Sequence, residues 1–238
     1  VILIMLLTSL VKADLITDPD HYLSVVDQGF YYSSGYHNPS DIRPYAGSYG
    51  AQANNFLVFN LTAVTEEIVN AVIQLDTKDL TQGGVFTLYD VSTSIDTLRD
   101  GGVGLVSIYN DLGQGTLLGT ASILDTDDGS VVQIQIDSSY LDSLNAARVA
   151  GDRHWAVGGS YASSGYAFGV PYNEFSGAPP PALADFANNQ LLLQTIPEPT
   201  ATALIGLSSG IFFVGRRIFR RKKKEEVVEE MHFPVDLK

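Results

Sequence analysis

The sequence has 238 residues, a length that suits one medium-sized domain or two small ones, and 45% of them are hydrophobic, enough to bury a core. It contains no cysteine, which excludes disulfides, thiolate metal sites and a cysteine nucleophile within these residues. The formal net charge is −13, and most of the basic side chains lie near the C-terminus. This distribution argues against nucleic-acid binding by the body of the chain.

The first segment has the pattern of an export signal. An apolar run over residues 1–10 is followed by Val11-Lys12-Ala13, whose small residues fit the rule for signal-peptidase cleavage. We therefore predict a signal peptide over residues 1–13 and a mature chain that begins at Asp14. The alternative is a buried first strand. Because no basic leader precedes the run, we expect a truncated gene start or a non-standard start codon.

Residues 14–195 are predicted to form a single exported β domain. Extended runs alternate apolar and polar side chains, and clusters of Gly, Asn and Asp separate them. In the clearest run, residues 131–136, apolar Val132 and Ile134 flank Gln133. We expect strands in this run and at 55–61, 71–75, 85–91, 155–157, 166–170 and 190–195.

One short helix is predicted within this domain. Ser139 is a suitable N-cap, Leu144 and Ala147 follow at helical spacing, and Gly151 can end the helix. No internal repeat of the kind that a β-solenoid requires is found. Many short strands with one small helix are typical of a sandwich, so we predict an all-β fold, a jelly-roll-like β-sandwich.

Tyrosines are concentrated at the start of the predicted domain, among Ser, Gly, Asn and Pro. Aromatic rings on loops can stack on sugar rings while their polar ends stay in water. We name Tyr31, Tyr32, Tyr36 and Trp155 as candidate glycan contacts. The alternative is that these side chains pack within or at the edges of strands.

A cluster of aspartates suggests a calcium site. Asp125, Asp127 and Asp128 are the candidate ligands, because hard cations bind grouped carboxylates. They lack the spacing and the distal glutamate of an EF-hand loop. The Asp-Gly pair that ends the cluster, just before the run at 131–136, is also typical of a hairpin turn. The two interpretations are compatible.

Patterns of catalytic residues are weak. His21, His37 and His154 have no second ligand at a metal-binding spacing, so we expect each of them in a solvated loop. The segment 158–162, Gly-Gly-Ser-Tyr-Ala, nearly fits a nucleophile elbow, but no histidine follows it within the predicted domain, and we expect a loop there. A glycosidase needs two facing carboxylates, and no spacing in the sequence pairs two of them. We predict that the protein is not an enzyme and needs no cofactor other than the candidate calcium.

The C-terminal part combines three adjacent features. Pro197, Glu198 and Pro199 precede an apolar run at 200–215. As a helix this run of about 16 residues would measure about 24 Å, short for a hydrocarbon core of about 30 Å, but flanking basic side chains can reach the interface. We therefore predict a C-terminal transmembrane helix. The basic cluster that follows comprises Arg216, Arg217, Arg220, Arg221, Lys222, Lys223 and Lys224.

The charge of the two regions predicts the topology. Residues 14–196 hold 5 basic and 21 acidic side chains, a net charge of 5 − 21 = −16, whereas residues 216–224 hold 7 basic and no acidic ones. By the positive-inside rule the basic end stays in the cytoplasm and the acidic domain is exported. The alternative for the basic cluster is a nuclear-localisation or RNA-binding segment.

The order Pro-Glu-Pro, short apolar helix and Arg-rich cluster over residues 196–224 resembles the PEP-CTERM sorting signal, a tail also named after the C-terminus of an ice-binding protein. The resemblance implies recognition of Pro197–Pro199 by an exosortase-type enzyme of Gram-negative, often biofilm-forming bacteria. It also implies release to, or attachment at, the cell surface. Unlike most such tails, this one continues as a polar tail over residues 225–238. The middle of the chain resembles the exported domain of some PEP-CTERM proteins at 56–61, 73–75, 86–93, 110–115 and 145–147.

These features together predict an exported, non-enzymatic cell-surface or extracellular-matrix protein that passes through an inner-membrane intermediate and binds exopolysaccharide. Its expected partners are the membrane, the processing enzyme and polysaccharide, with no nucleic acid. Two alternatives stay open. One is a permanently anchored single-pass adhesion or receptor protein, with residues 225–238 in the cytoplasm. The other is a secreted glycan hydrolase.

Overall fold

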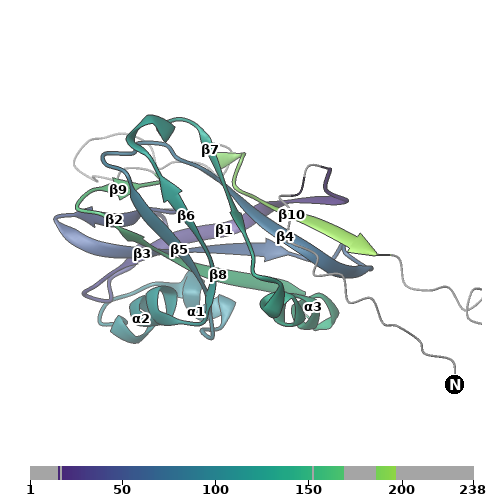
Figure 1. Ribbon diagram of the computed structural model, residues 1–238. Helices are drawn as coiled ribbons and strands as arrows, with labels where there is room; N and C mark the ends of the chain where they lie inside the picture. Colours follow the sequence, from purple (N-terminus) through teal and green to yellow (C-terminus); the bar gives the residue numbers. More distant parts are fainter. Residues whose placement is uncertain (1–15, 17, 152, 169–185, 197–238) are drawn as a thin grey trace, which may run out of the picture. The chain divides into compact units, whose positions relative to one another are not determined.

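The structure is a computed structural model that describes residues 16, 18–151, 153–168 and 186–196 (Figure 1). The predicted signal peptide, the Pro-Glu-Pro motif, the apolar run at 200–215 and the basic cluster lie outside these residues. None of the helices in the described ranges has the length and apolar character that a membrane span requires.

Antiparallel strands dominate the described part of the chain, which confirms the all-β prediction. They pair in the order β6-β5-β8-β3-β1-β10-β4-β7, with β2 added beside β3 and β9 beside β2. The strands are β1 (His21–Tyr32), β2 (Ala46–Tyr49), β3 (Ala51–Asn60), β4 (Glu67–Asp76), β5 (Gly84–Asp90), β6 (Leu117–Ile123), β7 (Val131–Gln135), β8 (His154–Ala162), β9 (Tyr166–Ala167) and β10 (Gln190–Ile196).

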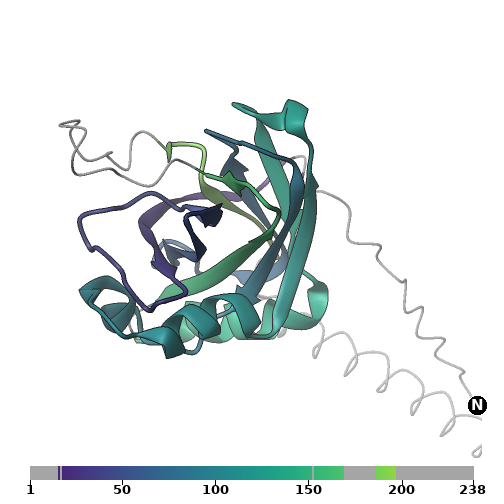
Figure 2. The ribbon, with the colours of Figure 1, turned by 90° about the vertical axis from the view of Figure 1, so that its left-hand side faces the viewer.

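The sheet is continuous and curls into a nearly closed barrel, where the sequence predicted two sheets of a jelly-roll sandwich (Figure 2). Strand β1 connects the two halves of the sheet. Its first part, His21–Ser24, pairs with β10, and its second part, Val25–Tyr32, pairs with β3. The end strands β6 and β7 follow each other in the chain. At the end away from their connecting turn, the Asp137 amide, just after β7, donates to the Leu118 carbonyl of β6 at 2.8 Å.

The main core fills the inside of the curled sheet and confirms the predicted alternation. In β3, Leu57 and Phe59 point inward and are fully buried. Their neighbours Phe56 and Val58 point outward and are also buried, in a second core. Two short helices cover this outer face, so β3 is apolar on both sides.

Three α-helices occur in the described ranges: α1 (Ile95–Asp100), α2 (Val106–Gln114) and α3 (Leu141–Val149). Helix α3 confirms the helix predicted after Ser139, and the 3₁₀ turn η2 (Ser138–Tyr140) precedes it. Its Asn145 side chain fixes the helix to the start of β4, accepting from the Ile68 amide and donating to the Ile68 carbonyl, each at 2.9 Å.

Helices α1 and α2 were not predicted. Each is short, and α2 buries only Ile108 and Leu112, so its apolar periodicity is brief. The glycines between the two helices further resemble a loop in sequence. Both helices lie along the same side of the sheet (Figure 1).

Two consecutive glycines in β8 allow α2 to lie directly against the sheet. A Cβ on Gly158 would lie 2.5 Å from the Leu112 carbonyl oxygen of α2. A Cβ on Gly159, which faces the opposite side, would lie 2.2 Å from the Phe86 ring in the main core. The prediction of a loop at 158–162 was therefore wrong. These residues belong to β8, and its two glycines let α2 approach one face and the Phe86 ring approach the other.

We predict that Gly158→Ala lowers the free energy of unfolding by about 1–3 kcal/mol, because the added methyl group must displace the backbone of α2. Urea denaturation of the full chain measures this change. Gly151→Ala is the matched control, since a Cβ there meets nothing within 4 Å. Equal losses for the two variants would contradict the close packing of α2 on β8.

Candidate functional site

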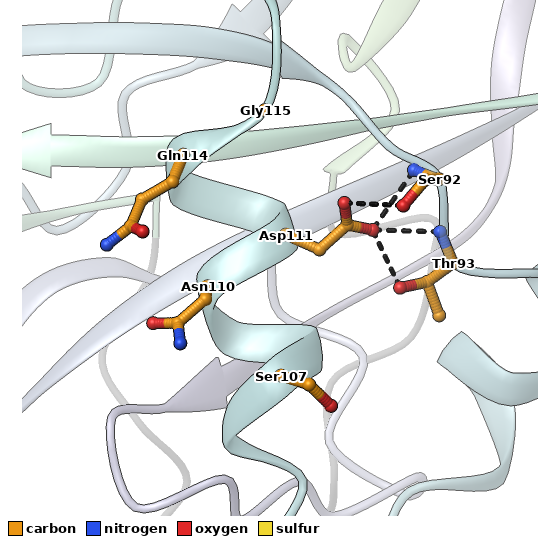
Figure 3. Close-up of a pocket in the computed structure, with 7 residues that line it drawn as sticks. All are labelled: Ser92, Thr93, Ser107, Asn110, Asp111, Gln114 and Gly115. Atoms are coloured by element: carbon orange, nitrogen blue, oxygen red, sulfur yellow. Dashed lines mark hydrogen bonds between the residues drawn. The ribbon is translucent and has the colours of Figure 1, made fainter.

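Helix α2 and the loop after β5 border a shallow, open pocket with mostly polar lining residues on the outside of the domain (Figure 3). Its volume is about 390 Å³, within the range of about 300–1,000 Å³ usual for small-ligand sites. The residues that line it are Ser92, Thr93, Ser107, Asn110, Asp111, Gln114 and Gly115.

The helical repeat places four of these side chains on one face of α2. Residues 107, 110, 111 and 114 are spaced by three and four positions, which is the spacing of neighbours on a helix surface. The opposite face carries Ile108 and Leu112, which are buried in the second core. Burial of this apolar face leaves the polar face in solvent, with Asp111 directed at the Ser92–Thr93 loop and Asn110 and Gln114 extending away from it (Figure 3).

Asp111 holds the two sides of the pocket together. Its Oδ2 accepts hydrogen bonds from the Ser92 amide at 3.0 Å, the Thr93 amide at 2.8 Å and the Thr93 hydroxyl at 2.7 Å. Its Oδ1 accepts from the Ser92 hydroxyl at 2.8 Å. Figure 3 shows all four bonds running from the helix to the loop. Because both hydroxyls donate to Asp111, their oxygens are left to accept hydrogen bonds from a ligand.

The pocket carries negative charge. Burial raises the pKa of Asp111, but the hydrogen bonds from Thr93 and Ser92 outweigh it and leave that pKa below its ordinary value. The pKa of Asp90, at the end of β5, is raised. Burial is the main cause and the negative charge of Asp111 adds to it, whereas a hydrogen bond from the Val91 backbone lowers this pKa. Of the described residues that line the pocket, none is basic. An ionised Asp111 therefore has no cation beside it there.

Two of the four candidate glycan contacts are core residues. Tyr31 is fully buried, and its hydroxyl donates to the carbonyls of Leu98 at 3.1 Å and Thr97 at 3.3 Å. Burial, with the charge of Asp100, raises the pKa of Tyr31 to about 12. Trp155 is buried in the main core against Phe59. The prediction that Tyr31 and Trp155 contact glycan was wrong, because both rings are used for packing.

Tyr32 and Tyr36 keep the geometry of a contact surface. Their rings are stacked, with centroids 6.2 Å apart and planes 11° from parallel. Tyr36 is 40% exposed, and Tyr32 is half-buried. The turn between them lies against the start of α2, where the Leu105 amide donates to the Gly35 carbonyl at 3.0 Å.

The candidate calcium ligands form a turn. The carboxylate of Asp127 accepts from the Leu124 amide at 2.8 Å, that of Asp128 accepts from the Leu80 amide at 2.9 Å, and that of Asp125 accepts from the Gly83 amide. These residues lie in and beside the 3₁₀ turn η1 (Asp125–Asp127), and Gly129 follows with φ of 71°. The turn is confirmed, but it does not close a hairpin, because β6 pairs with β5 and β7 pairs with β4. In the part of the chain that the structure describes, no group of three His, Asp or Glu side chains could hold a metal ion.

The histidines are not in solvated loops as predicted. His37 is 3% exposed, its ring is stacked on Tyr31 with centroids 4.5 Å apart, and its Nδ1 lies 2.7 Å from the Phe30 carbonyl oxygen. Its backbone forms an isolated bridge with Gly102, between α1 and α2. His21 lies in β1 and His154 begins β8. Nothing in the sequence distinguishes His37 from the other two.

The pocket was missed at the sequence level. In the sequence, residues 110–115 are singled out only by a resemblance to the exported domain of some PEP-CTERM proteins. The polar spacing along α2 indicates one helix face but not the loop that faces it. No protein-family model matches this chain, and no curated protein is found to match it. Interpretation of the site therefore depends on its geometry.

His37 predicts a specific dependence of stability on pH. Burial lowers the pKa of His37, and this effect outweighs the Phe30 carbonyl, Asp41 and Asp27, which raise it. The unfolded chain, with a histidine pKa of about 6.5, therefore takes up the proton first as the pH falls, and stability is lost below that pH.

We expect His37→Gln to reduce the difference in unfolding free energy between pH 7.5 and pH 5.5, measured by denaturant titration of the full chain. The comparison is made within each protein, so an overall loss of stability in the variant does not affect it. A variant that loses as much stability on acidification as the original chain would contradict a buried, neutral His37.

Proposed function

We propose that this protein is an exported cell-surface or extracellular-matrix component that binds polysaccharide without altering it. Export and sorting are supported by the sequence alone, through the predicted signal peptide, the PEP-CTERM-like tail and the contrast between an acidic domain and a basic cluster. In this proposal an exosortase-type enzyme recognises Pro197–Pro199 while the basic cluster holds the end of the chain in the cytoplasm.

The observation that supports polysaccharide binding is the pocket on α2. Hydroxyl, amide and carboxylate side chains surround it, and these groups form hydrogen bonds with sugar hydroxyls. The stacked Tyr32 and Tyr36 lie on a turn that contacts the start of the same helix and offer an aromatic surface for a second sugar ring.

We favour binding over hydrolysis because four hydrogen bonds hold the Asp111 carboxylate against the Ser92–Thr93 loop. This arrangement suits a residue that positions the loop. The hydrolase alternative has one observation in its favour. The pKa of Asp90 is raised and that of Asp111 is lowered, and such a divergence is typical of a general acid beside an ionised carboxylate. Release of sugar fragments, abolished by Asp90→Asn, would select the hydrolase.

The export proposal predicts the ends of the mature protein. In the native host we expect a chain that begins near Asp14 and ends near Pro197–Thr200, determined by intact mass and terminal peptide mapping. A chain that retains residues 216–238 would contradict proteolytic sorting and favour a permanently anchored protein.

A further inference from the structure

We infer that the pocket on α2 binds uncharged sugar residues of a polysaccharide and excludes anionic ones. This inference rests on the proposed function and assigns the ligand class and the residues that contact it. The site consists of Asn110, Gln114 and Ser107 on the helix, with Ser92 and Thr93 on the facing loop.

The hydrogen-bonding groups match a polyhydroxyl ligand. Asn110 and Gln114 each offer two N–H donors and a carbonyl acceptor; both side chains are exposed and line the pocket, and they extend from the side of α2 away from the Ser92–Thr93 loop (Figure 3). The Ser92 and Thr93 hydroxyls donate to Asp111, so toward a ligand they act as acceptors. Sugar hydroxyls both donate and accept, and a set of mixed donors and acceptors of this kind can form hydrogen bonds with them.

The charge of the pocket excludes anions. A uronic acid or a sulfated sugar would bring a second negative charge close to Asp111, with no basic residue among the described lining residues to compensate it. Four donors already face the Asp111 carboxylate, so its attraction for a cationic sugar and its repulsion of an anionic one are both reduced, and the negative charge that remains still disfavours the anion. An uncharged sugar is not repelled by Asp111, and it does not need a basic residue in the pocket to neutralise it.

The pocket is formed before any ligand arrives. Asp111 fixes the loop to the helix, and close contact with Gly158 and a hydrogen bond of 2.9 Å from the Asn54 side chain to the Tyr109 carbonyl fix the helix to the sheet. A site that needs little ordering loses less free energy on binding.

The test compares three soluble polymers with the full chain: a neutral glucan, a polyuronate and a polymer of cationic amino sugars. Isothermal titration calorimetry measures each affinity. The variant Asn110→Ala/Gln114→Ala removes two exposed side chains, and Gln194→Ala, at an exposed position of β10, is the matched control. We expect the glucan to bind best and the double variant to lose about tenfold in affinity, as two lost hydrogen bonds imply, while the control keeps it.

The outcomes separate this inference from the proposed function. Unchanged glucan binding by the double variant would overturn the pocket as the site and leave polysaccharide binding intact. Tighter binding of the polyuronate or of the cationic polymer would overturn the ligand class. If none of the polymers binds, both the inference and the polysaccharide part of the proposed function fail, while the termini of the mature protein still test export.

Discussion

The contact between α2 and the backbone of β8 at Gly158 determines the geometry of the candidate site. A side chain at that position would push the helix outward, and the Leu112 face of α2 would no longer bury the outer apolar side of the sheet. Because that face is buried, Asp111 points to the Ser92–Thr93 loop, while Asn110 and Gln114 extend from the side of the helix away from it (Figure 3). The pocket is thus a consequence of how tightly one short helix packs.

The negative charge of the whole domain and that of the pocket both disfavour anionic ligands. Residues 14–196 carry a net charge of 5 − 21 = −16, which disfavours anionic polymers over the whole domain, and Asp111 brings the same preference to the pocket. The cationic residues of the chain are concentrated at 216–224, where the proposed function uses them for retention at the membrane. Under the proposed function, both effects would disfavour anionic polysaccharides.

Sequence reasoning succeeded where a side chain's neighbours along the chain decide its environment. The strands at β4, β5 and β7 alternate clearly because one face meets the core, and α3 forms where it was predicted, although its N-cap is Tyr140 and the Ser139 hydroxyl instead donates to Asp137. It failed where segments that are distant in the sequence determine the environment of a residue. β1 joins both parts of the sheet by changing partner along its length, and Gly158 and Gly159 resemble a loop unless the helix and the Phe86 ring on either side are known. The pocket likewise forms between a loop and a helix, and nothing in the sequence indicates that the two are neighbours. Tyr31 and Trp155 are buried, but their sequence surroundings resemble those of surface aromatic residues.

In our proposal, the polar face of α2 and the Ser92–Thr93 loop bind neutral sugars. Hydrogen–deuterium exchange of the full chain, with and without a saturating neutral oligosaccharide, tests it most directly. We predict slower exchange in peptides that cover 92–93 and 106–115, with no change in β10 at 190–196. Protection confined to other segments, or no protection under conditions where binding is detected, would contradict the claim.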